Sequence, residues 1–267
     1  MRSITLVTLL VVFPAMAMAD PVEGIDPQLA TSERSDWVIQ VTPYIWAAAL
    51  KGDVSPFQRG PEVSVEKSFS DIMDSLNMAG FINLWGRQGN WIISGDIMFV
   101  DTTNSRTTRP LPALPGVPPG LTVKGELDSK QFSATLQGGY RFHDANGITV
   151  DALAGARYWN ISNRLNVAAA GRSVEFEESF DWFDPIVGAR IFVPINDEWS
   201  FQAQGDIGGF GVGSDKTWSL LATVNWIVTD RASISAGYKV LDVDYSDDGH
   251  VFDTQLRGPV IGATWRF

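Results

Sequence analysis

The chain has 267 residues and no cysteine, and its 31 acidic side chains outnumber its 20 basic ones, giving a formal net charge of −11. This acidic balance argues against binding to nucleic acid and against electrostatic docking on anionic surfaces. Without cysteine there is neither a disulfide framework nor thiolate chemistry, and beyond the N-terminal segment no run approaches the roughly 18 apolar residues of a transmembrane helix.

Residues 1–19 have the features of a secretory signal peptide. Arg2 gives a positive start, and the run ITLVTLLVVF that follows is apolar but too short to span a bilayer. Ala17 and Ala19 are small residues at the two positions that a signal peptidase reads, so cleavage is expected after Ala19. Loss of Arg2 then takes the net charge from −11 to −12.

The mature chain is expected to begin with a flexible periplasmic segment at residues 20–36, followed by one domain at 37–267. It is rich in tryptophan, phenylalanine and glycine, with 10, 15 and 25 of these residues in the whole chain. An exported chain of this composition is either a large soluble β domain or an outer-membrane barrel. The periodicity of the sequence decides between the two.

Apolar and polar residues alternate through the domain. In residues 130–142 (KQFSATLQGGYRF), Phe132 and Leu136 fall on one parity, and Gln137 and Arg141 fall on the other. Alternation over this length is typical of a strand with one apolar and one polar face. Ten strands are predicted in this way, at 37–50, 77–87, 91–103, 121–142, 147–168, 173–193, 198–209, 214–229, 231–246 and 250–267.

Short and long connections alternate between these strands. The short turns are 87–90, 143–147, 195–198 and 229–231, and the longer links are 51–77, 104–120, 168–172, 208–214 and 246–250. Tight periplasmic turns and longer extracellular loops are the layout of a bacterial outer-membrane barrel. We therefore predict an all-β fold, an up-and-down antiparallel transmembrane β-barrel of about 10 strands, within a range of 8–12. Several strands exceed the roughly 9–11 residues needed to cross a membrane and should project beyond it.

Aromatic residues cluster beside the predicted short turns. Tryptophan and tyrosine favour the membrane–water interface, where the ring is half buried and the polar atom stays hydrated. The competing interpretation, the core of a soluble sandwich, fits less well because the tryptophans gather at strand ends. The aromatics concerned are Trp37, Trp85, Trp91, Tyr140, Phe142, Phe192, Trp199, Trp226, Trp265 and Phe267.

The first long connection contains a strand-like stretch (EVSVEKSF), whose place in the wall is left open, and then a short helix within residues 68–80. Ser70 can cap this helix, and its apolar residues stand at helical spacing. The helix either covers the barrel as a plug or lid or lies on the loop surface. The candidate plug or lid residues are Asp71, Ile72, Met73 and Leu76. A proline-rich stretch at 109–120 predicts a semi-rigid extended loop.

The last ten residues, GPVIGATWRF, form a strand with two different faces. Its apolar parity holds Ile261, Ala263, Trp265 and Phe267 and is predicted to meet lipid. The strand must pair with the first one, because an open edge in hydrocarbon leaves backbone groups without hydrogen bonds. A terminal phenylalanine with apolar residues at steps of two resembles the signal that the outer-membrane barrel assembly machinery reads.

Polar residues on the opposite parity are predicted to line the lumen. They form either a pathway for a small polar solute or an ion-pair network that fills a narrow barrel, and the geometry of about ten strands favours the network. The predicted lumen residues are Asp96, Gln137, Arg141, Asp151, Arg157, Asp184, Arg190, Gln202, Gln204, Asp206, Asn225, Lys239 and Arg266.

The case for catalysis is limited to one acidic stretch. Residues Asp242–Asp253 contain His250, with Ser246 nearby, which leaves an outer-membrane hydrolase with a site at the extracellular rim as the alternative function. The stretch lacks the spacing of an EF-hand, and no histidine pair is placed to hold a metal. We predict no catalytic residue, no cofactor and no metal.

The stretches TPYIWAAALKGDV and KSFSDIMDSLNMAGF, together with the aromatic end, resemble a widespread set of Gram-negative outer-membrane β-barrel proteins, most of them functionally uncharacterised. The resemblance covers nearly the whole mature chain and implies location in the outer membrane and a small transmembrane barrel. It supplies no catalytic residues. The predicted function is a non-enzymatic integral membrane protein, structural or a narrow channel for small polar solutes, whose partners are the lipid bilayer and the assembly machinery.

Overall fold

The computed structural model describes residues 37–58, 60–109 and 122–267. The predicted signal peptide, the segment at 20–36 and most of the proline-rich stretch lie outside these residues. Within them, no helix combines the length and apolar character needed to cross a membrane.

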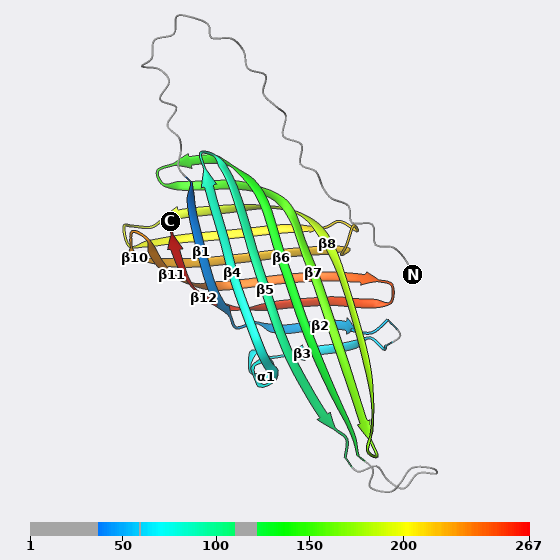
Figure 1. Ribbon diagram of the computed structural model, residues 1–267. Coiled ribbons are helices and arrows are strands. Elements are labelled where there is room, and N and C mark those ends of the chain that lie inside the picture. Colours follow the sequence, from blue (N-terminus) through cyan, green and yellow to red (C-terminus); the bar gives the residue numbers. More distant parts are fainter. Residues whose placement is uncertain (1–36, 59, 110–121) are drawn as a thin grey trace, which may run out of the picture. The chain divides into compact units, whose positions relative to one another are not determined.

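The domain is a strongly tilted antiparallel sheet that closes on itself (Figure 1). Ten strands form the barrel, in the order β1-β4-β5-β6-β7-β8-β9-β10-β11-β12, and β12 pairs back onto β1. Two short strands extend the sheet beyond β12 in the order β12-β2-β3. The elements are β1 (Val38–Trp46), β2 (Ala49–Ser55), β3 (Val63–Lys67), α1 (Phe69–Ser75), β4 (Leu76–Gln88), β5 (Trp91–Thr107), β6 (Val123–Ala145), β7 (Ile148–Ala169), β8 (Arg172–Pro194), β9 (Trp199–Gly209), β10 (Lys216–Thr229), β11 (Ala232–Asp247) and β12 (His250–Arg266).

The C-terminus closes the barrel, as the final strand predicted. The backbone N–H of Phe267 donates to the carbonyl of Ile39 at 2.9 Å, and the N–H of Ile39 donates to the carbonyl of Phe267 at 3.3 Å. Both chain ends of the barrel and the short turns after β4, β6, β8 and β10 therefore lie at one end, which we call the terminal end. The other end, with α1 and the tips of β6–β8, is the distal end.

The long strands project beyond the others at the distal end. β6, β7 and β8 have 23, 22 and 23 residues, roughly twice what a membrane crossing needs (Figure 1). Two distal connections predicted as longer links, 168–172 and 246–250, are instead tight hairpins. Ala170–Gly171 and Asp248–Gly249 have positive φ at both positions, as a two-residue hairpin turn requires, so the strands continue to the turn itself.

The predicted first strand, 37–50, is broken. β1 and β2 both pair with β12 but are separated at Ala47 and Ala48, opposite Gly258 and Pro259. Proline has no N–H to donate to the neighbouring strand, so the ladder is interrupted there. A Cβ at Gly258 would lie 2.0 Å from the carbonyl oxygen of Ala47, so the glycine permits this close approach.

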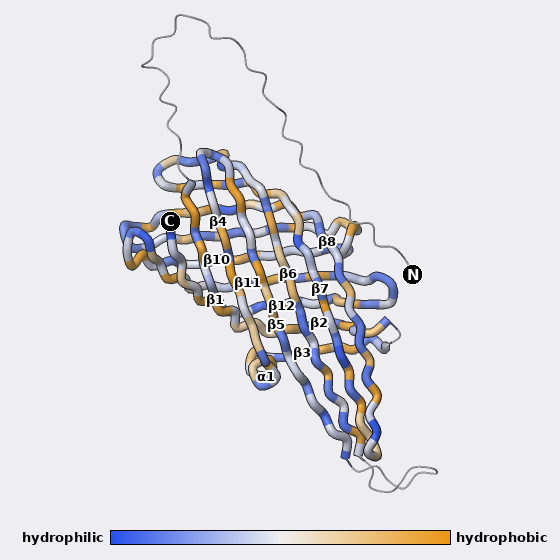
Figure 2. Tube along the Cα trace, in the orientation of Figure 1, coloured by the Kyte–Doolittle hydropathy of each residue, from blue (hydrophilic) through white to orange (hydrophobic). Residues whose placement is uncertain are grey.

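The outer face of the barrel is an apolar belt. Figure 2 shows hydrophobic and hydrophilic residues alternating along the wall strands, and on β10 the outward positions from Trp218 to Trp226 include Leu220 and Val224. Beyond the belt, outward positions turn polar, as at Lys130 and Asp181. On β10 the belt runs from Trp218 to Trp226, close to the roughly 9–11 residues with which a strand crosses a bilayer at the usual tilt.

Eight of the ten predicted interface aromatics lie exposed near the terminal end: Trp37, Trp91, Tyr140, Phe142, Trp199, Trp226, Trp265 and Phe267. The prediction was wrong for Trp85, which is buried in the lumen, and for Phe192, which lines a cavity there. Both occupy inward positions, and the clustering of aromatics at strand ends did not distinguish the two faces.

A substitution at Leu136 tests whether the apolar belt faces lipid. Its side chain is 61% exposed and points outward from the middle of β6. Leu136→Arg is expected to lower the free energy of unfolding by about 2–4 kcal/mol, because a cation near the bilayer midplane is costly. Denaturant titration in lipid vesicles measures this, with Ser162→Arg beyond the belt as the control. Equal effects of the two substitutions would contradict the orientation.

Candidate functional site

Polar side chains fill the terminal half of the lumen. Arg141 donates through Nε to Asp151 Oδ1 at 2.8 Å, and Arg190 donates through Nη2 to Gln202 Oε1 at 2.6 Å. The guanidinium of Arg190 lies 4.5 Å from the ring centre of Trp85, a cation–π arrangement. A cavity of about 100 Å³ lies at this level, lined in part by Gln202 and Asn225.

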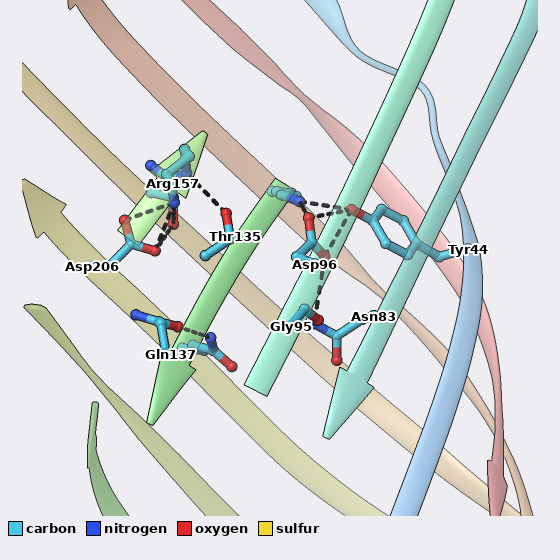
Figure 3. Close-up of polar contacts among 11 residues, drawn as sticks. Tyr44, Asn83, Gly95, Asp96, Thr135, Gln137, Arg157 and Asp206 are labelled. Carbon is cyan, nitrogen blue, oxygen red and sulfur yellow. Dashed lines mark hydrogen bonds and ion pairs between the residues drawn. The ribbon is translucent and has the colours of Figure 1, made fainter. Parts of the chain in front are cut away.

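Two ion-pair clusters cross the middle of the lumen (Figure 3). In the first, Arg157 Nη2 lies 2.8 Å from Asp206 Oδ1, and the guanidinium also donates to the hydroxyls of Thr135 and Thr217. Both charged partners are buried. Because side chains from four strands, β6, β7, β9 and β10, contribute to this one cluster, it links distant parts of the wall.

The second cluster joins Lys239, Tyr44 and Asp96. Lys239 Nζ donates to Tyr44 Oη at 2.7 Å and to Asp96 Oδ1 at 2.9 Å, and Tyr44 donates to Asp96 at 3.0 Å. Asn83 also donates to Asp96 (Figure 3). The cavity between the two clusters has a volume of about 40 Å³. The spaces at the terminal and middle levels suit water molecules and not a drug-sized solute.

The remaining predicted lumen residues differ in their surroundings. Gln204 Nε2 donates to Gln137 Oε1 at 3.3 Å, and Asn225 Nδ2 donates to Ser200 Oγ at 3.2 Å. Asp184 is fully buried but lies apart from the ion pairs, accepting from Trp182 Nε1 and from the backbone N–H of Ser214. Arg266 is exposed at the terminal end, where it lines the cavity.

Apolar side chains fill one side of the distal lumen. Trp182 and Tyr245 stack with ring centres 4.0 Å apart, and Trp159, with no exposed surface, stacks on Trp182 at 5.7 Å. Phe180 and Phe252 belong to the same cluster. These aromatics come from β7, β8, β11 and β12, so the opposite side of the lumen is left unfilled.

That unfilled side is a chamber of about 760 Å³, the principal feature that the sequence-based prediction missed. Its volume lies within the range of about 300–1,000 Å³ found for small-molecule sites. The lining is mostly aliphatic and aromatic; the inward apolar residues include Trp46, Leu50, Phe81, Met98, Val100, Leu127, Ile161, Leu165, Phe180 and Leu256. The polar clusters of the middle level lie between the chamber and the terminal end.

The wall beside the chamber is incomplete. β1 pairs with β4 only as far as Tyr44 opposite Phe81, and β2 pairs with β3 only from Leu50 opposite Lys67. The sheet pairings of the described residues leave Ile45–Ala49 without a partner on this side, and we call this gap the seam. Lys67 Nζ reaches across to β5 and donates to Asn104 Oδ1 at 2.8 Å.

The helix α1 lies at the seam. Its N-cap is Ser68 and not Ser70, because Ser68 stands three residues before Asp71 and the two form a capping box. The Ser68 hydroxyl accepts from the Asp71 N–H at 3.2 Å, and the Asp71 carboxylate accepts from the Ser68 N–H at 2.9 Å. Of the predicted plug or lid residues, Ile72, Met73 and Leu76 line the chamber, and Asp71 serves the cap.

The acidic stretch Asp242–Asp253 does not assemble a nucleophile–base pair. Asp247 is opposite His250 and Ser246 is opposite Val251, so Ser246 and His250 point to opposite faces of the sheet. His250 is buried, its ring 4.4 Å from that of Phe180 and its Nε2 3.6 Å from Glu178. In the described part of the chain, no group of three or more acidic or histidine side chains could hold a metal ion.

The predicted assembly-signal residues share the outer face of β12. Ile261, Trp265 and Phe267 are exposed, and Ala263 is half-buried on the same face. This apolar row continues the belt down to the terminal end.

Comparison with known proteins supports the fold. No protein-family model matches the chain, and no curated protein sequence matches it. Among solved structures, the outer membrane protease OmpT from Escherichia coli is similar with a TM-score of 0.51 at 12% identity, covering 87% of this chain and 97% of that chain. The translocator domain of the autotransporter NalP from Neisseria meningitidis gives 0.48 at 10% identity, covering 90% and 92%. Ail from Yersinia pestis gives 0.32 at 14% identity, covering 86% and 98%.

Of these three, only the outer membrane protease OmpT has a TM-score above 0.5. At such low identities the likeness concerns the fold alone. The chain is an antiparallel closed β-barrel of the outer-membrane type, with ten barrel strands, two extra strands and one short helix.

Proposed function

We propose that this barrel is an integral protein of the Gram-negative outer membrane that binds an apolar small molecule in its distal chamber, without catalysing a reaction. The apolar belt supports a position in lipid, and the short turns support a periplasmic position for the terminal end. The chamber then lies in the extracellular half of the lumen.

The chamber itself carries the proposal. Lumen-filling side chains normally close a barrel of this size. Here about 760 Å³ remains beside a stacked aromatic cluster and is lined by side chains such as Met98, Val100 and Leu165. An apolar cavity with few convergent polar groups is the usual character of a site for an apolar ligand.

The polar half of the lumen favours binding over conduction. The predicted channel for small polar solutes requires a continuous wet pathway, but the ion pairs Arg157–Asp206 and Lys239–Asp96 cross the lumen between the two ends. Buried pairs of this kind are costly to separate. We propose that the network seals the barrel and supports the wall.

The predicted hydrolase at the rim gains no support from the geometry. Ser246 is exposed and His250 is buried on the opposite face, so neither can activate the other. We propose no catalytic role for the acidic stretch.

Binding of the apolar fluorophore N-phenylnaphthylamine to the barrel in nanodiscs tests the proposal. Ala48 lines the chamber and is buried, so Ala48→Phe is expected to weaken binding at least about tenfold by filling the space. Ala263→Phe adds the same bulk on the lipid side and should leave binding unchanged. The proposal would be refuted if Ala48→Phe left the affinity for the fluorophore unchanged, or if binding to the barrel never exceeded binding to empty nanodiscs.

Planar-bilayer recording tests the seal. The wild-type barrel is expected to give no sustained ionic current, because the network occupies the lumen. A steady current of one reproducible size would instead favour the narrow polar channel.

A further inference from the structure

We infer that the ligand of the chamber is a single-chain amphiphile with an anionic head group, which passes in sideways from the membrane through the seam and leaves its head at Lys67 and Arg106. This inference rests on the proposed function and specifies the chemistry of its ligand. Three observations support it: the level of the seam, the charges at its rim and the size of the chamber.

The seam opens within the apolar belt. Ile45 points outward, is 70% exposed and is opposite Ile261 of the belt, while the next residue, Trp46, points inward. Both side chains line the chamber. A cavity lined from both faces of one strand is open through the wall, so lipid tails and the chamber meet at this point. A molecule already dissolved in the bilayer can reach the chamber without crossing water.

The rim of the chamber carries two cations that no carboxylate neutralises directly. Lys67 on β3 and Arg106 on β5 both line the chamber from opposite sides of the gap. In the part of the chain that the structure describes, the Lys67 side chain bonds only the neutral amide of Asn104, and the Arg106 side chain makes no hydrogen bond or ion pair. Two neighbouring cations without a paired anion favour an anionic ligand group.

The carboxylates near this rim already have other partners. Asp71, which interacts electrostatically with Lys67, holds the capping box of α1 through Ser68. Glu66 also lines the chamber, but its carboxylate lies 3.9 Å from Lys51 on the outer face. The charge that faces the chamber is therefore positive.

The volume of the chamber limits the size of the ligand's apolar part. About 760 Å³ suits one drug-sized molecule, so one acyl-like chain fits the chamber better than the two chains of a phospholipid. The chain would lie against Met98 and Val100, while the head stays with Lys67 and Arg106.

Two matched probes test the head group: dansyl-undecanoic acid and its uncharged methyl ester, titrated onto the barrel in phosphatidylcholine nanodiscs. The acid is expected to bind about tenfold more tightly than the ester, the scale of one charge-assisted contact. Lys67→Gln/Arg106→Gln should abolish this preference and leave the affinity for the ester unchanged. Lys124→Gln should change neither, because Lys124 is next to the chamber residue Gly125 in sequence but pairs with Glu126 at 2.7 Å on the outer face.

The possible outcomes distinguish failure of the head-group assignment from failure of the proposed function. If both probes bind equally, or if the preference survives the double substitution, the assignment of the head group is overturned while the chamber remains a binding site. If neither probe binds above the level of empty nanodiscs, the proposed function fails together with the inference.

Discussion

Arg157→Met is expected to lower the free energy of unfolding by about 3–5 kcal/mol, because it leaves Asp206 as a buried charge without its partner. In the structure, Arg157 Nη2 lies 2.8 Å from Asp206 Oδ1, and the side chains are 5% and 4% exposed. After the substitution, the Ser219 hydroxyl is the only donor among the described residues that still bonds to the Asp206 carboxylate. Denaturant titration in lipid vesicles gives the change.

The double variant Arg157→Met/Asp206→Leu is the control for this prediction. Replacing both charges with apolar groups of similar volume removes the cost of burying an unpaired charge, so the double variant should be distinctly more stable than the single one. A double variant as unstable as Arg157→Met would mean that the loss comes from packing. The lumen network would then not depend on charge pairing.

Much of the barrel could be predicted from the sequence, because alternation reports directly on the two environments of a barrel wall. Leu136 and Gln137 are neighbours in sequence, yet one is exposed to lipid and the other is buried in the lumen. Strand boundaries followed from the turns, and closure followed from the need to pair the last strand with the first. The break between β1 and β2 was not visible, because it depends on Pro259, which is more than 200 residues away.

The chamber was missed although a signal for it exists. The inward parity that is polar near the middle of the barrel becomes apolar beyond it: Asp96 is followed by Met98 and Val100, and Lys239 is followed by Leu241 and Val243. Parity identifies which side chains point inward. Whether those side chains fill the lumen or leave space depends on how strands from opposite sides of the barrel meet, and no local pattern contains that information.

Closing the seam is expected to have the largest functional effect. Lys67→Cys/Asn104→Cys, bridged by a short bifunctional thiol reagent with a cleavable disulfide linker, should slow uptake of N-phenylnaphthylamine from the surrounding lipid at least about tenfold, because the bridge ties β3 to β5 beside α1. Reducing the bridge should restore the rate. The natural absence of cysteine makes the introduced pair the only reactive thiols, and a neutral probe avoids confusion with the loss of Lys67.

A second cysteine pair distinguishes the effect of closing the seam on uptake from the effect of making the wall more rigid. The Ser162 and Ser179 hydroxyls lie 2.9 Å apart on β7 and β8, where the wall is continuous, so Ser162→Cys/Ser179→Cys can be cross-linked without touching the seam. If only the Lys67–Asn104 bridge slows uptake, the probe passes through the wall beneath α1. If the bridged barrel fills at the unbridged rate, the chamber is reached from its water-facing distal mouth. The break in the ladder at Ala47 and Ala48 would then affect only the shape of the wall.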